Sequence, residues 1–157
     1  MVLLESFIKV DGDLVPMAAS GIPVPVPDPD YIEGALHFVA DGVEVLPKYL
    51  HDYVDQLWAY LVDAADVVSH GDAFKTYMPG QAITLLFVPV EFAKLRIERR
   101  EYKDVAVTVS RREFVSEIVR KGTEFFEDLA ELVPELSAEC QDQLLKIGRI
   151  RVPGSFH

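Results

Sequence analysis

The octapeptide Val107-Thr-Val-Ser-Arg-Arg-Glu-Phe114 predicts a β-strand that passes directly into a helix. Its first half alternates apolar and polar residues, as a half-buried strand does. Ser110 and Glu113 then form a capping box, in which the hydroxyl accepts from the Glu113 amide and the carboxylate reaches back to the Ser110 amide. Val109 and Phe114 occupy the positions of a hydrophobic staple. A helix is therefore expected to begin at residue 111 with almost no linker before it.

Three helices are predicted, because apolar residues recur at steps of three and four in three places. Pro47 suits a first helical position, and Gly71 suits the residue after a helix end. Pro134 separates the second helix from the third. The expected ranges are about 47–70, 111–133 and 135–147.

Strand signals occupy most of the remaining chain. Asp11-Gly12 and Asp41-Gly42 are typical two-residue hairpin turns. Residues 73–109 are expected to form an antiparallel meander around the apolar run Ile83–Val90. The hairpin strands are expected at 2–10 and 13–17, and at 31–40 and 43–46. The fold class that follows is α+β, an antiparallel twisted sheet of about 6–8 strands with the helices packed mainly on one face. The pattern leaves open whether all strands share one sheet.

The chain of 157 residues fits a single domain spanning 1–157. Proline stands at every second position from Pro23 to Pro29, which removes alternate backbone donors and favours an extended arm over 18–30. A polyproline II ligand is the alternative for this segment. Residues 149–157 are expected to form a loose C-terminal tail.

The charge of this chain is unevenly distributed, with a net value of −11. Residues 1–72 contain thirteen Asp and Glu against two lysines, and residues 122–145 contain seven acids and no Lys or Arg. Residues 91–121 between them carry nine basic residues against six acids. Such a surface disfavours direct binding to nucleic acid or to an anionic membrane and favours a basic protein partner.

Two acidic strips are candidate partner-binding surfaces. In the first predicted helix, aspartates eleven residues apart align along the helix axis, because eleven residues make about three turns. The second strip follows a similar spacing in the second helix. A solvated helix face with no partner is the alternative for both strips. The residues are Asp52, Asp55, Asp63 and Asp66 in the first strip, and Glu124, Glu127, Asp128 and Glu131 in the second.

No sequence motif predicts catalysis, a metal site or a cofactor. The four histidines form no metal-binding spacing, and no phosphate-binding glycine loop or nucleophile elbow is present. Asp11-Gly-Asp13 and Asp28-Pro-Asp30 could bind a divalent cation, but turn chemistry explains both pairs. Cys140 lies on an apolar stripe and is expected to be a buried thiol.

Location is inferred from what the sequence lacks. The first ten residues lack the basic start and cleavage site of a signal peptide. The longest uncharged stretch, 76–90, is broken by prolines and is shorter than the ~18–20 residues that a membrane helix needs. A single cysteine excludes an intrachain disulfide. We therefore expect a cytoplasmic protein that is not a membrane protein.

Residues 31–147 resemble the immunity proteins of bacterial polymorphic toxin systems in architecture. The resemblance is carried by Trp58-Ala-Tyr-Leu-Val-Asp followed by Ser-His-Gly71, and by residues 107–114 followed by Phe125-Phe-Glu-Asp-Leu129. It implies a non-enzymatic acidic domain that neutralises a cognate toxin, most simply a nuclease. It implies no individual site residue.

The leading hypothesis is therefore a binding protein that occupies the substrate surface of a basic toxin. Two alternatives stay open. The first is an enzyme or small-ligand binder with a pocket between sheet and helices. The second is an oligomeric structural or adaptor module that assembles through the proline-rich arm.

Overall fold

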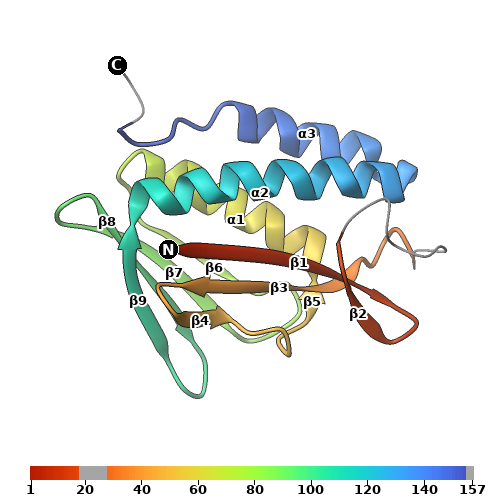
Figure 1. The fold of residues 1–157 in the computed structure, drawn as a ribbon, viewed down its shortest axis with the longest axis horizontal. Helices are drawn as coiled ribbons and strands as arrows, with labels where there is room; N and C mark the ends of the chain where they lie inside the picture. The colour runs from red at the N-terminus through yellow and green to blue at the C-terminus, as the bar shows by residue number, and fades with distance from the viewer. Residues whose placement is uncertain (18–27, 155–157) are drawn as a thin grey trace.

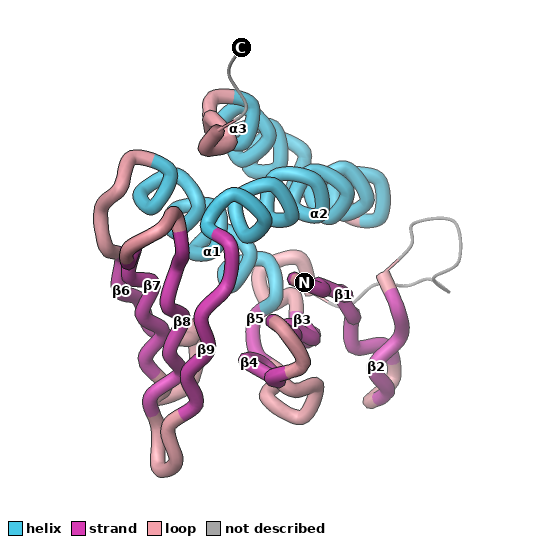
Figure 2. Tube along the Cα trace, turned by 60° about the vertical axis from the view of Figure 1, so that its left-hand side comes forward, coloured by secondary structure: helices cyan, strands magenta, loops and turns pink. Residues whose placement is uncertain are grey.

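Three helices gather on one side of the protein, and two antiparallel sheets lie on the other (Figures 1 and 2). The computed structural model describes residues 1–17 and 28–154. The helices are α1 (Val54–Ser69), α2 (Arg111–Leu132) and α3 (Ser137–Gly148), and a short 3-10 turn, η2 (Pro134–Leu136), precedes α3. The predicted α+β class is confirmed.

The first sheet contains the two predicted hairpins. Its order is β2-β1-β3-β4, and β5 also pairs with β3. Asp11 and Asp41 have φ values of 50° and 46°, and the following glycines have 86° and 80°, as a type I′ hairpin turn requires. The strands are β1 (Val2–Val10), β2 (Asp13–Pro16), β3 (Glu33–Ala40), β4 (Val43–Leu46) and β5 (Asp52–Tyr53).

The second sheet is the predicted meander, in the order β6-β7-β8-β9. Its apolar strand β7 lies between two others, and Phe87 pairs with both Phe74 and Ile97. The strands are β6 (Phe74–Tyr77), β7 (Thr84–Val90), β8 (Lys94–Arg100) and β9 (Val105–Ser110). The hairpins and the meander therefore form two separate sheets, a point that the sequence pattern leaves open.

Helix α1 begins seven residues later than the predicted helix over 47–70. Residues 47–50 form a turn, closed by the Leu50 amide on the Pro47 carbonyl at 3.0 Å. Asp52 then pairs with Gly34 in the first sheet. The apolar spacing of Leu50 and Val54 imitates a helix, but pairing with β3 holds the intervening backbone extended. The other two predicted helices are confirmed within two residues at each end.

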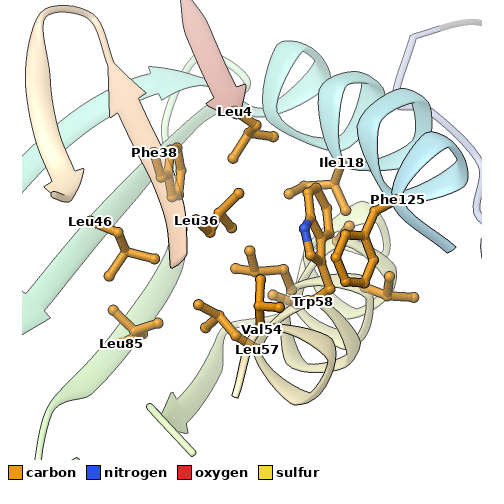
Figure 3. Close-up of a cluster of buried hydrophobic side chains, with 14 of the residues drawn as sticks. Leu4, Leu36, Phe38, Leu46, Val54, Leu57, Trp58, Leu85, Ile118 and Phe125 are labelled. Carbon is orange, nitrogen blue, oxygen red and sulfur yellow. The ribbon is translucent and has the colours of Figure 1, made fainter. Parts of the chain in front are cut away.

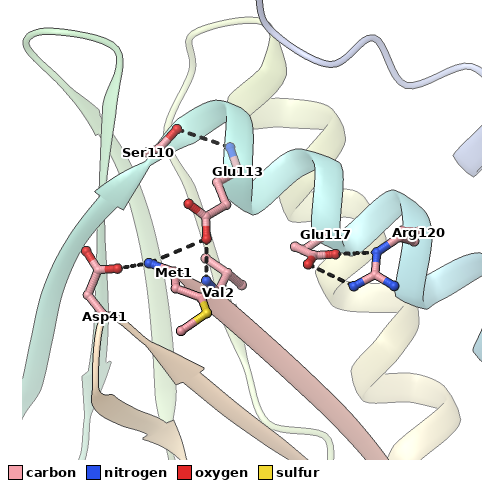
Figure 4. A network of polar contacts seen from close by, with 7 residues as sticks. All are labelled: Met1, Val2, Asp41, Ser110, Glu113, Glu117 and Arg120. Carbon is pink, nitrogen blue, oxygen red and sulfur yellow. Dashed lines mark hydrogen bonds and ion pairs between the residues drawn. The ribbon is translucent and has the colours of Figure 1, made fainter.

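The start of α2 completes only half of the expected capping box (Figure 4). The Glu113 amide donates to the Ser110 hydroxyl at 3.2 Å. The Glu113 carboxylate does not turn back to Ser110. It accepts from the Val2 amide at 2.5 Å and lies 3.4 Å from the Met1 ammonium, which also pairs with Asp41. Glu113 therefore joins α2 to β1.

The core is centred on Trp58 of α1, which is fully buried between the sheets and α2 (Figure 3). Its ring stacks on Phe125 with centroids 5.7 Å apart, and its indole N–H donates to the Ser6 hydroxyl at 2.9 Å. Leu36 from β3 and Leu85 from β7 are buried in the same cluster. The core therefore receives side chains from both sheets and from the helices.

The first part of the C-terminal tail packs against the core, although the sequence predicts that this segment is loose. Ile150 is buried and Val152 packs against the core. Both residues come directly after α3, so the packing of that helix against the core continues to residue 152. Residues 155–157 and residues 18–27 of the predicted arm lie outside the described part of the chain.

Candidate functional site

The first predicted acidic strip does not form a continuous exposed row. Asp52 precedes α1 and lies in β5. Its carboxylate accepts from the Gly80 amide at 3.0 Å and from the Gln81 side chain at 3.3 Å. Asp52 therefore holds the turn between β6 and β7 against β5.

Asp55 lies in the first turn of α1 with one carboxylate oxygen buried. Within residues 1–17 and 28–154, no group donates a hydrogen bond to that oxygen. Burial raises the pKa of Asp55 above its ordinary value, although nearby backbone amides act in the opposite direction. The charge of Asp55 in turn contributes to the raised pKa of Cys140 on α3. Asp55 therefore lies close enough to α3 for its charge to act on Cys140.

The last two aspartates of this strip have nearby cationic or titratable partners. The Lys146 ammonium of α3 donates to the Asp63 carboxylate at 2.5 Å. The Asp66 carboxylate lies 3.9 Å from the His70 ring, one helical turn along α1. The four aspartates therefore contact three different parts of the fold.

The second predicted strip is brought together on α2. Desolvation raises the pKa of Asp128, and the charges of Glu124, Glu131 and Glu127 raise it further. The one cation that contacts this group within the described chain is Lys121, 3.5 Å from Glu124. Like charges at this spacing repel, so the cluster gives the helix no stability of its own.

A surface groove of about 390 Å³ runs between this strip and the first sheet. Glu124, Glu127 and Asp128 line one side, and Glu5 of β1 adds a fourth carboxylate on the other. A second groove continues past Glu5 and Lys121 along β1. Glu131 lies outside the lining.

Sequence reasoning missed Glu5. Its exposure follows from the alternation of β1, in which Leu4 faces the core. That β1 lies beside α2 depends on contacts more than a hundred residues apart, such as Val2 with Glu113. The alternation could have marked Glu5 as exposed, but no local signal places it near the acidic strip.

The described residues contain no group of three or more His, Cys, Asp or Glu side chains that could hold a metal ion. Burial raises the pKa of the Cys140 thiol to about 11, which disfavours the reactive thiolate. Asp28 accepts from the Asp30 amide at 2.9 Å, as the turn interpretation predicts. In the described part of the chain, no helix is both long enough and apolar enough to cross a membrane.

Comparisons of the chain with protein-family models, with curated proteins and with solved structures found no match. Functional inference therefore depends on the residues and contacts of the chain itself.

Proposed function

We propose that this chain is a non-enzymatic acidic domain that binds and neutralises a basic protein partner. The observation that supports this function is the second strip on α2 (the α2 strip), where burial and then the charges of three neighbouring carboxylates raise the pKa of Asp128. One lysine contacts them within the described residues. Repulsion among these groups destabilises the free protein and is relieved when cationic side chains bind.

The mechanism is charge complementarity. Glu5 and the α2 carboxylates would attract lysine and arginine side chains, accelerate encounter and make affinity fall with added salt. A nuclease toxin is the partner class that fits, because its substrate surface must carry positive charge for phosphates. In this proposal the carboxylates occupy that surface, as an immunity protein does.

The test is affinity capture from native lysate at low salt, with bound proteins identified by mass and released at high salt. The binding-strip variant carries Glu124→Gln, Glu127→Gln, Asp128→Asn and Glu131→Gln. The control variant carries the same charge change on dispersed exposed acids, as Asp13→Asn, Asp72→Asn, Glu91→Gln and Asp104→Asn. We expect wild type and the control to retain one basic protein that the binding-strip variant loses.

Equal retention by both variants would discard this surface. Lysine substitutions of the aspartates in the first strip would be less informative, because Asp52 and Asp63 make internal bonds. Such substitutions would alter the fold together with the charge.

The two alternatives have less support from the described residues. The acidic groove is open at the surface, and none of its lining residues is a histidine. His51 and Asp52 do line a separate pocket of about 220 Å³, but the Asp52 carboxylate there is already bonded to Gly80 and Gln81. Most of the proline-rich arm of the adaptor alternative lies outside the described residues.

A further inference from the structure

Helix α3 is the outermost element of the helical layer and lies across α1 and α2 (Figures 1 and 2). Cys140 and Ile147 are its buried residues, and Leu144 packs against the core as a partly buried side chain. Ile150 and Val152 continue the contact beyond its end. An element attached by so few buried side chains is the kind that opens locally before the whole protein unfolds.

Two polar groups around the middle of α3 are poorly matched. Asp55 of α1 and Gln143 of α3 each have a buried side-chain oxygen without a hydrogen-bond donor in the described residues. Both lie near Cys140: the Asp55 charge acts on its thiol, and Gln143 follows it by three residues along α3. Buried acceptors that lost water and gained no donor destabilise the closed arrangement.

The second half of α3 supplies most of the attachment. Ile147 packs over Gly122 of α2, where an ideal Cβ would lie 3.3 Å from the Ile147 Cδ1 atom. Lys146 pairs with Asp63, but both side chains are about two-fifths exposed. An ion pair that exposed contributes little. The contact of α3 with α1 and α2 therefore combines tight apolar packing at Ile147 with two buried oxygens that lack a hydrogen-bond donor in the described residues.

We propose that α3 is a locally opening cover, and that residues 137–152 detach from α1 and α2 as one unit while both sheets stay folded. Detachment exposes Asp55 further and releases Asp63 from Lys146, so that both carboxylates join the acidic surface. The opening needs no partner and can be measured on the protein alone, so its failure leaves the proposed function untouched.

Cys140 makes this opening measurable, because it is the only cysteine of the chain and lies in the closed contact. The labelling rate of Cys140 by an excess of a thiol-reactive disulfide is measured in urea below the unfolding transition. Global unfolding is followed in parallel by circular dichroism. We expect Cys140 to be labelled at least tenfold faster than it would be if it became accessible only through global unfolding. The labelling rate should also depend less on urea than global unfolding does. Labelling at the global rate, with the global urea dependence, would overturn the proposal.

Three variants test the contacts that determine how readily α3 opens. Asp55→Asn removes the charge and adds a donor, and should slow labelling about two- to fivefold. Lys146→Gln removes the ion pair and should accelerate labelling about two- to fivefold. Asp66→Asn makes the same chemical change on α1 beside His70 and should leave the rate unchanged. Identical rates for Asp55→Asn and Asp66→Asn would refute the role of the polar contact.

Discussion

Asp55 shows how one carboxylate can act against the fold that holds it. Burial raises its pKa above the ordinary 3.8, so the folded protein favours the neutral form more than the unfolded chain does. The charge therefore lowers stability at neutral pH, and this loss disappears as the pH falls through the raised pKa toward 3.8.

Asp55→Asn should accordingly stabilise the protein at pH 7, by less than about 1 kcal/mol because the residue is only partly buried. The gain should shrink as the pH is lowered and vanish once wild-type Asp55 is protonated. Urea unfolding at several pH values measures this difference. Asp66→Asn is the control, and a gain for Asp55→Asn that stays constant with pH would contradict the assignment.

Ser110 is the residue that ends β9 and starts α2. Its hydroxyl accepts from the Glu113 amide, one of the amides at a helix start that have no partner within the helix. Ser110→Ala should lower the free energy of unfolding by about 1 kcal/mol. Ser116→Ala, the same change at an exposed site inside α2, should cause no loss in the same urea titration and a gain of at most about 0.5 kcal/mol from helix propensity. Equal losses would argue against a specific cap.

At the scale of elements, Gly122 allows α2, α1 and α3 to approach one another. A Cβ at this position would lie 3.3 Å from Ile147 and 3.4 Å from Trp58. Trp58 cannot withdraw easily, because its ring stacks on Phe125 and its indole N–H is bonded to Ser6. The close approach therefore depends on the missing side chain.

Gly122→Ala should be less stable than Gly148→Ala by about 1 kcal/mol or more, although alanine favours a helix at both sites. Gly148 is a fair control, because a Cβ there has no atom within 4 Å apart from its own helix backbone and chain neighbours. Thermal and urea unfolding of the two variants provide the comparison. Equal stability would mean that Ile147 and Trp58 adjust without strain.

Local signals predicted most element boundaries, and their one large error has a local cause. Asp-Gly turns set two hairpins, and Ser110 set the start of α2. Leu50 and Val54 stand four residues apart, as on a helix, but Asp52 between them pairs with Gly34 across the sheet. Periodicity records which residues are buried and does not distinguish a helix from a turn and strand over so few residues.

At the scale of the whole molecule, the sequence could not predict which elements meet. The α2 strip was predictable because its members are three or four residues apart. Glu5 joins them only because β1 lies beside α2, and Asp55 is partly buried at a position where its charge acts on Cys140 of α3. Contacts between distant segments therefore decided which predicted acids remain available to a partner.

Arg99 connects the two sheets and is the most deeply buried charged residue of the described chain. Its guanidinium donates to the Val45 carbonyl of β4 at 2.6 Å and pairs with Glu101 at 3.1 Å. Only 6% of its surface is exposed. The bond therefore satisfies a buried carbonyl of one sheet from a strand of the other.

Arg99→Met should lower the free energy of unfolding by about 1–3 kcal/mol, because it leaves the Val45 carbonyl without its donor. Arg100→Met is the matched control: this next residue of β8 is exposed and pairs with Glu98 at 3.3 Å. Its loss should stay below about 1 kcal/mol, as for other exposed ion pairs. Urea unfolding followed by Trp58 fluorescence measures both variants. Similar losses would show that the sheets are held together by the shared core alone, with no net contribution from the Arg99 bond.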